Sequence, residues 1–463
     1  MGRRSLLLLL IIAGFNLIYN AFLPLHPDEA YYWTWSKHLQ LSYYDHPPMI
    51  AYMIKLATFL GQSEFAIRLV AVFCMTLAAW VIYRLARGLF NERVADITLL
   101  IMLFLPVTQA GYLVVTPDAP LVLFWSLTLY CIYKALWENK RSYFYWAGIS
   151  AGCLLLSKYT GMMLFPGMLI FLISSRYRAI LHRRDTYVAL LLALVVFSPV
   201  VIWNAQHDWV SLRFQLMHGM GGAKVLKLGN LGDFLGGQAF TVNPVFLLAL
   251  LYYAVRHVRT NVREEKLAFL FWPFLFTFLF FLYGGLFKKG EANWAVPAYL
   301  TGTVLLAYWI EKLNRRWIYY TGVGFTIAMV MLVKFPEAFP NLPKQLVLKQ
   351  QFMGYREIFR QGRKYAQDPA QIILSDSYQH ASEAWYYLGR RSEVYILSPS
   401  RVSMYDFWRT GLPKPAMRDA VFFGSEENAK SLDRFYAHVQ PIDILYYEGR
   451  FGTRYISVYR CSN

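Results

Sequence analysis

Long apolar runs are the feature that most limits how this chain can fold. A helix needs about 20 residues to cross the hydrocarbon core of a bilayer, and inside that core every backbone polar group has to be hydrogen-bonded within the protein. Such runs recur through the first 334 of the 463 residues and then stop. Charged residues make up only 16% of the chain, against roughly 25% in an average soluble domain. We therefore predict an α-helical polytopic membrane protein with its membrane domain at 1–334.

Eleven apolar runs are candidate membrane-spanning helices. Their approximate bounds are 5–23, 66–87, 94–113, 119–137, 143–157, 160–175, 187–203, 234–255, 267–286, 295–310 and 317–334. The first run follows a basic start, as in a signal peptide. Because no small-x-small cleavage site follows it and many spans do, we expect it to be retained as a helix.

Lysine and arginine mark one end of these spans. The basic segments, which the positive-inside rule places in the cytoplasm, lie at 3–4, 84–93, 140–141, 175–184, 256–266 and 311–316. The N-terminus is then cytoplasmic and everything after Lys334 is periplasmic. The predicted location is a bacterial inner membrane.

The net charge of +18 follows from these basic loops. Anionic lipid of the bilayer is therefore the expected partner, and nucleic acid is not. The four cysteines have neither disulfide nor zinc-ligand spacing. No GxxxxGK[ST] phosphate-binding loop occurs, so ATP-driven chemistry is not indicated.

The last 129 residues, 335–463, change character. Short β-like runs such as "QIILSDS" and "RYISVYR" alternate with helical stretches at 355–367, 378–389 and 428–439. This alternation predicts a small periplasmic α/β domain.

The segment that follows the first span, 24–65, concentrates acids, histidines and aromatic residues. Asp28 and Glu29 stand beside "AYYWTW", an aromatic wall that would raise the pKa of a carboxylate towards that of a general base. The alternative is a solvated, charged lip at the membrane boundary. We expect an amphipathic helix from Glu29 to Leu41 and a second that starts at Pro47 and Pro48, both along the outer interface.

Two ionisable residues interrupt apolar stretches on the predicted outer side. Asp118 in "TPDAPL" is costly so close to bilayer depth and is a functional candidate, although a helix cap is the alternative. Lys158 in "LSKYTG" either snorkels to the interface or meets a phosphate. Positive charge is unfavoured on this side of a membrane, so we prefer the phosphate.

Two further outer segments could bind substrate. "KKGEANW" carries Lys288, Lys289, Glu291, Asn293 and Trp294, which offer cations, donors and a stacking surface for phosphate and sugar. The glycine-rich segment 204–233 is predicted to be a long mobile loop.

With these residues identified, the chain resembles the GT-C superfamily of integral-membrane glycosyltransferases. It is most similar to the bacterial branch of lipid A aminoarabinose transferases and protein O-mannosyltransferase relatives. The motifs that carry the resemblance are, in order, "HPDEAYYW", "YYDHPPM", "TPDAPL", "LSKYTG" and "KGEANWAVPAY". The resemblance implies a polyprenyl-phosphate sugar donor, an envelope glycan or lipid acceptor such as lipid A, inversion at the anomeric carbon, and a site at the periplasmic face.

The resemblance also implies roles for individual residues. Asp28 matches the first-loop acid taken as general base, and Glu29 its neighbour that orients acceptor or base. Asp118 matches the acid of the second outer loop. Lys288, Lys289 and Glu291 match the loop that borders the phosphate. Relatives often carry an acid followed by lysine before two prolines. This chain has Asp45 and His46 there, so the phosphate contact would pass to a protonated His46 or to Lys158.

The residues are also compatible with two other functions and with a metal site. A lipid-linked-sugar flippase would place its site at mid-membrane between related halves, and a membrane scaffold would leave Asp118 and Lys158 unexplained. His26, Asp28, Glu29 and Asp118 could together hold Mg²⁺ or Mn²⁺, the three acids through hard oxygen ligands. We expect no metal and no other cofactor.

Overall fold

The computed structural model describes the chain except for 60, 221–225, 340–341, 343–346, 369–370, 390–393, 397–400, 409–417 and 451. Two compact units make up the chain. The first contains Met1–Asn20, Gln40–Met53 and Arg68–Met331, and the second contains Ala21–Leu39, Ile54–Ile67 and Leu332–Asn463. Most of the segment that follows the first span therefore belongs to the same unit as the C-terminal segment.

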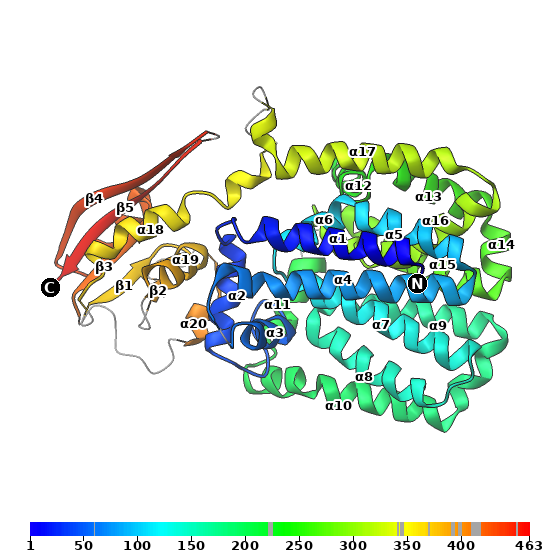
Figure 1. Cartoon of the computed structure of the whole chain (residues 1–463). Helices are drawn as coiled ribbons and strands as arrows, with labels where there is room; N and C mark the ends of the chain where they lie inside the picture. Colours follow the sequence, from blue (N-terminus) through cyan, green and yellow to red (C-terminus); the bar gives the residue numbers. More distant parts are fainter. Residues whose placement is uncertain are drawn as a thin grey trace. The chain divides into compact units, whose positions relative to one another are not determined.

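Helices dominate the first unit (Figure 1). The α-helices among the described residues are α1 (Arg3–Asn20), α2 (Pro27–Lys37), α3 (Met49–Ala57), α4 (Glu64–Leu89), α5 (Glu92–Phe104), α6 (Pro106–Leu113), α7 (Asp118–Trp137), α8 (Ser142–Ser157), α9 (Leu164–Ser174), α10 (Arg184–Gln206), α11 (Val210–Met220), α12 (Leu228–Val242), α13 (Pro244–Arg256), α14 (Val258–Arg263), α15 (Glu265–Gly285), α16 (Ala298–Lys312), α17 (Arg316–Lys334), α18 (Tyr355–Gly362), α19 (Tyr378–Leu388), α20 (Met404–Trp408) and α21 (Glu426–Ala429).

Six helices in the described part of the chain are long and apolar enough to cross a bilayer, namely α1, α4, α7, α10, α15 and α17. Three bent pairs raise the number to nine if each pair is one span. Pro106 and Pro244 begin the second helix of two of these pairs, which fits a break because proline cannot continue a helical hydrogen-bond ladder. The multi-pass membrane architecture is confirmed. The number eleven stays a prediction.

Close packing on α10 fixes the position of α8 in the first unit. A Cβ atom on Gly148 would lie 2.2 Å from the carbonyl oxygen of Ala189, and one on Gly152 would lie 2.8 Å from that of Ala193. The Gly-x-x-x-Gly spacing places both glycines on one helix face and lets two backbones approach closely. This contact holds α8, whose C-cap is Lys158.

The segment 204–233, predicted to be a loop, is largely helical. α10 extends to Gln206, α11 follows, and α12 begins at Leu228. Side-chain contacts favour the helices. The side chain of Asn204 accepts the backbone N–H of Leu212 at 3.3 Å, and Ser211 hydrogen-bonds Tyr159 at 2.9 Å. The glycine content favours a loop, but these tertiary contacts outweigh that local preference.

A five-stranded mixed sheet, in the order β2-β1-β3-β5-β4, occupies the C-terminal part of the second unit (Figure 1). β1 (Ile372–Ser375) pairs in parallel with β2 (Val394–Ile396) and β3 (Ala420–Gly424), whereas β4 (His438–Gly449) and β5 (Gly452–Ser462) form an antiparallel ribbon. Every residue of β1, β2 and β3 is buried, so both faces of these strands are covered.

One predicted helix in this region is wrong. The stretch 428–439 contains only the end of α21 and the 3-10 helix η9 (Leu432–Arg434) before β4 begins at His438. Pairing of β4 with β5, from His438 opposite Ser462 onwards, outweighs the local helical pattern. Strand pairing of this kind is not visible in a local helical period.

Asp376 joins the carboxyl ends of β1 and β3. Its buried carboxylate accepts hydrogen bonds from the imidazole of His380 at 2.7 Å, from the backbone N–H of Ser425 at 2.8 Å and from the side chain of Asn428 at 3.2 Å. Burial alone would raise the pKa of Asp376, but these donors hold it well below its usual range. The carboxylate is therefore ionised in the folded unit.

We expect Asp376→Ala to destabilise the second unit by about 3 kcal/mol, because buried donors lose a charged acceptor. Since the folded pKa is depressed, the stabilisation is present above about pH 4 and is lost as the pH falls below that value. Limited proteolysis of the purified chain across this pH range measures both effects. Glu427→Ala, which removes an exposed carboxylate beside Asn428, is the control. Equal protease sensitivity of the two variants would contradict the expectation.

Candidate functional site

Two of the predicted residues form an ion pair where two apolar helices end. α7 begins at Asp118, and Lys158 is the C-cap of α8. The Nζ atom of Lys158 donates to Oδ1 of Asp118 at 2.7 Å, and the two side chains are 7% and 20% exposed. Charges shielded from water in this way interact more strongly than they would at a surface.

The geometry rules out the simpler explanations for both residues. Lys158 is buried against a carboxylate, so it does not snorkel towards water. α7 has Pro117 as its N-cap and no side-chain cap hydrogen bond, so Asp118 does not cap its own helix. The Thr116 hydroxyl accepts the backbone N–H of Asp118 at 3.3 Å and donates to its Oδ2 at 3.4 Å.

A third predicted residue joins this pair from the 3-10 helix η3 (Ala292–Ala295). The Nδ2 atom of Asn293 donates to Oδ2 of Asp118 at 2.9 Å. α12 holds η3 in place, because the amide of Gln238 donates to the first backbone carbonyl of η3 at 3.0 Å. The hydroxyl of Tyr299 donates to Gln238 in turn, at 2.6 Å.

We call Asp118, Lys158 and Asn293 the polar triad. Both carboxylate oxygens of Asp118 are engaged within it. An ammonium group has three N–H donors, and within the described residues Lys158 donates one of them, to Asp118. The triad therefore presents a fixed cation with unused donors, which suits binding of a phosphate or stabilisation of a departing one.

The other predicted residues of the 288–294 segment lie outside the triad. Lys288 and Lys289 are exposed; the first donates to a backbone carbonyl of α11 at 3.4 Å, and the second lies 3.7 Å from a carboxylate of α12. Glu291 is exposed. The ring of Trp294 is half-buried, with its centroid 6.1 Å from that of an aromatic ring of α15. Their binding roles stay predictions.

The segment with Asp45 and His46 is held by α11 in the first unit. The backbone carbonyl of Asp45 accepts from Gln215 at 2.6 Å, and the ring of Tyr44 lies 4.6 Å from that of Phe214. Asp45 is buried and His46 is half-buried. The predicted second helix is present as α3, but it begins at Met49, directly after the two prolines predicted to start it.

Asp28 and Glu29 lie in the first turn of α2, in the second unit. α2 begins at Pro27, before the predicted Glu29, because His26 caps it, and it ends at Lys37, before the predicted Leu41. The backbone N–H of His26 donates to Glu29 at 2.8 Å, and its Nδ1 accepts the N–H of Asp28 at 3.2 Å. Glu29 is fully buried in this cap. The Asp28 side chain is 38% exposed, with Oδ2 3.8 Å from Nδ1 of His26.

The aromatic residues of α2 attach the helix to the C-terminal part of the same unit. The ring of Tyr31 lies 4.6 Å from that of Tyr378, and the ring of Trp33 lies 4.9 Å from that of Tyr386. The backbone N–H of Met404 donates to the Tyr31 hydroxyl at 2.8 Å. The expected aromatic wall thus packs against α19 and α20, and it fixes the helix that carries Asp28.

A polar connection that sequence reasoning missed strengthens this attachment. The hydroxyl of Tyr387 accepts the backbone N–H of Leu25 at 2.9 Å and donates to Glu64 at 3.2 Å, and Arg356 pairs with Glu64 at 2.9 Å. Burial raises the pKa of Tyr387, so its hydroxyl keeps the proton it donates. These partners are between 292 and 362 residues apart in the chain, and no local pattern links them.

Two comparisons by sequence match this chain to glycosyltransferases. Residues 45–203 match the family model described as dolichyl-phosphate-mannose-protein mannosyltransferase. The lipid A galacturonosyltransferase RgtD of Rhizobium johnstonii is 28% identical over 479 residues, which cover 98% of each protein.

Solved structures share the fold. ArnT from Cupriavidus metallidurans, solved in the apo state and bound to undecaprenyl phosphate, superposes with a TM-score of 0.71 in both states. The identities are 14% and 13%, and at least 97% of each chain is covered. The oligosaccharyltransferase AglB of Archaeoglobus fulgidus, in complex with an inhibitory peptide and a dolichol-phosphate, gives a TM-score of 0.55 at 13% identity. That match covers 98% of this chain and 74% of AglB.

Proposed function

We propose that this chain is a membrane glycosyltransferase of the GT-C class, and that it transfers a sugar from a polyprenyl-phosphate donor to an acceptor at the periplasmic face of the inner membrane. Lipid A is the first acceptor to test, and another envelope glycan is the second. The similarity to RgtD, named as a lipid A enzyme, supports the acceptor. The similarity to ArnT, which was solved with undecaprenyl phosphate, supports the donor lipid.

The observation that carries this proposal is the polar triad. Burying a lysine at the end of an apolar helix is energetically costly, so its presence indicates a function. Asp118 and Asn293 hold this lysine in a defined position. A lipid phosphate supplies the anion that the remaining Lys158 donors can bind. Asp118 then acts through Lys158, as a positioning residue.

The proposed reaction is a direct displacement. The acceptor oxygen bonds to the anomeric carbon as the bond from that carbon to the phosphate oxygen breaks. Asp28 takes the acceptor proton, and Lys158 stabilises the charge that develops on the departing phosphate. One base without a nucleophilic carboxylate gives inversion. Asp28 is suited to the role because its side chain is partly open to solvent on a firmly held helix.

The proposal includes the topology and the cofactor requirement. The N-terminus is cytoplasmic, eleven spans cross the membrane, and the C-terminal α/β domain is periplasmic, as the basic loops predict. The reaction needs no divalent metal, because Lys158 supplies the cation. Full activity of the purified enzyme after dialysis against a chelator is the expected result, and activity restored only by one divalent ion would contradict it.

The experiment that tests the function is mass spectrometry of lipid A, envelope glycans and glycoproteins from cells with and without the gene. We expect loss of one sugar-sized mass from the lipid A fraction, and its return with wild-type protein but not with Asp28→Asn. Loss from a protein fraction instead would identify a protein O-glycosyltransferase. If no fraction changes while a lipid-linked sugar moves between the leaflets at a different rate, the chain acts as a flippase and the proposal is wrong.

A further inference from the structure

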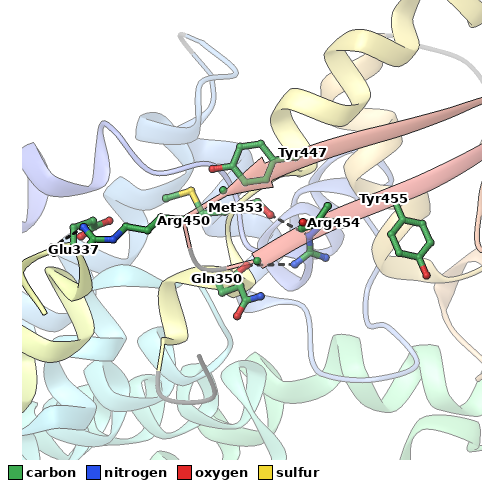
Figure 2. Close-up of a pocket in the computed structure, with 10 residues that line it drawn as sticks. Glu337, Gln350, Met353, Tyr447, Arg450, Arg454 and Tyr455 are labelled. Carbon is green, nitrogen blue, oxygen red and sulfur yellow. Dashed lines mark hydrogen bonds between the residues drawn. The ribbon is translucent and has the colours of Figure 1, made fainter. Parts of the chain in front are cut away.

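The second unit contains a pocket that none of the proposed catalytic residues lines. Its volume is about 350 Å³, and its polar lining includes Glu337, Gln350, Tyr447, Arg450, Arg454 and Tyr455. Figure 2 shows these side chains around the turn of the β4–β5 ribbon and beside the segment that follows α17.

Arg454 is fixed in the wall of this pocket. Its Nε donates to the backbone carbonyl of Met353 at 3.1 Å, and its Nη2 donates to that of Gln350 at 3.3 Å (Figure 2). The guanidinium also lies 3.9 Å from the ring centroid of Tyr355. Because these contacts already order the side chain, a ligand that binds it loses little conformational entropy.

Positive charge exceeds negative charge around the pocket. Arg450 donates to the backbone carbonyl of Glu337 at 2.8 Å, and Lys349 pairs with the carboxylate of Glu337 at 2.6 Å. Burial alone would raise the pKa of Glu337, but Lys349 and the charge of Arg450 lower it, so this acid is ionised. Among the lining residues, the two positive charges of Arg450 and Arg454 therefore outnumber the one negative charge of Glu337. Arginine suits oxyanions because it can bind them through two parallel hydrogen bonds.

The chain places the pocket close to the end of a membrane span. Glu337 follows Lys334, the last residue of α17, by three residues. Three extended residues reach at most about 11 Å. The last turn of α17 belongs to the second unit, so lipid headgroups at the end of this span are within reach of the pocket.

The pocket wall also continues to the helix that carries Asp28. Gln351, next to Gln350 of the lining, has its Oε1 3.4 Å from Nε2 of His26. The ring of Phe352 lies 5.3 Å from the imidazole of His26, which caps α2 and contacts Asp28. All of these residues belong to the second unit.

We propose that this pocket binds an oxyanion, a phosphate or a carboxylate, on the headgroup of the lipid-linked acceptor. Arg450 and Arg454 hold this group, and they thereby retain the acceptor on the unit that carries the base. The inference rests on the proposed function for the identity of the acceptor. The capacity of the pocket to bind an oxyanion does not depend on that function.

The first test measures binding without turnover. Inorganic phosphate and acetate are titrated into the purified full chain in neutral-lipid nanodiscs by calorimetry, with chloride as the ionic-strength control. We expect Arg450→Gln to weaken binding of the preferred anion about tenfold, because one charge-assisted hydrogen bond is lost. The control Arg460→Gln, on the exposed side of β5, should change it less than twofold. Absence of binding, or equal effects of both variants, overturns the proposal.

The second test measures transfer. We expect Arg450→Gln to raise the acceptor KM about tenfold with unchanged kcat and donor KM, and Arg454→Lys to do the same while the fold is retained. Anion binding without transfer to any acceptor would refute the proposed function and leave the anion site standing. Transfer with an unchanged acceptor KM would refute the site. If Arg450→Gln matters only in nanodiscs that contain phosphatidylglycerol, the oxyanion belongs to bulk lipid and the acceptor assignment is wrong.

Discussion

Asp28→Asn is expected to reduce the rate of sugar transfer by about 10²–10⁴-fold, the range for loss of a general base. Asparagine keeps the size and shape of the side chain, but its neutral amide cannot take the acceptor proton. The cap of α2 uses the side chains of His26 and Glu29 and the backbone of Asp28, so the helix should persist. Donor binding and thermal stability should stay close to the wild type. A transfer assay with purified protein, and a direct donor-binding assay, measure the two quantities.

Asp433→Asn is a suitable control, because it makes the same chemical change at an exposed position of η9 in the same unit. It should transfer sugar at the wild-type rate. Asp28→Glu should retain part of the activity, since a carboxylate remains at a different distance from the acceptor. Turnover of Asp28→Asn within tenfold of the wild type would remove Asp28 as the base. An equal loss of transfer rate in Asp433→Asn would mean that the effect comes from the assay and not from position 28.

The polar triad shows how much of the candidate site could be predicted from the sequence. Asp118 and Lys158 are predicted because an ionisable side chain within an apolar stretch is costly without a partner, whereas Asn293 is predicted as a hydrogen-bond donor to phosphate or sugar. The structure brings all three within hydrogen-bond distance. Lys288 and Lys289 were selected on weaker grounds, as cations on the unfavoured side of the membrane, and they contact α11 and α12 instead.

The composition of the second unit could not be predicted in the same way. Tyr387, Glu64 and Leu25 meet through hydrogen bonds between distant parts of the chain, and side chains that pair in this way carry no local period. The sequence predicts an aromatic wall around Asp28, because the positions of aromatic residues in a sequence do not show which surface they contact. The structure shows that Tyr31 and Trp33 pack on α19.

The Lys158–Asp118 pair gives the second large expected effect, and a double-mutant cycle separates its structural role from its functional role. Lys158→Met and Asp118→Asn should each destabilise the chain by about 3 kcal/mol, because each leaves a largely buried charge without its partner. Lys158→Met should also weaken donor binding about 10–100-fold, since it removes a charged donor to the phosphate. Asp118→Asn keeps that cation, so donor affinity should change less than about threefold.

The double variant should distinguish the two roles. With both charges removed no uncompensated ion remains, so its thermal stability should recover towards the wild type, whereas its donor affinity should stay as low as that of Lys158→Met. Lys266→Met, at an exposed lysine in the first turn of α15, should alter neither quantity. If donor affinity recovers together with stability, Lys158 affects binding only through the fold. If Lys158→Met binds donor as tightly as the wild type, the pair is a structural contact between α7 and α8, and the cation that stabilises the phosphate has to come from another residue.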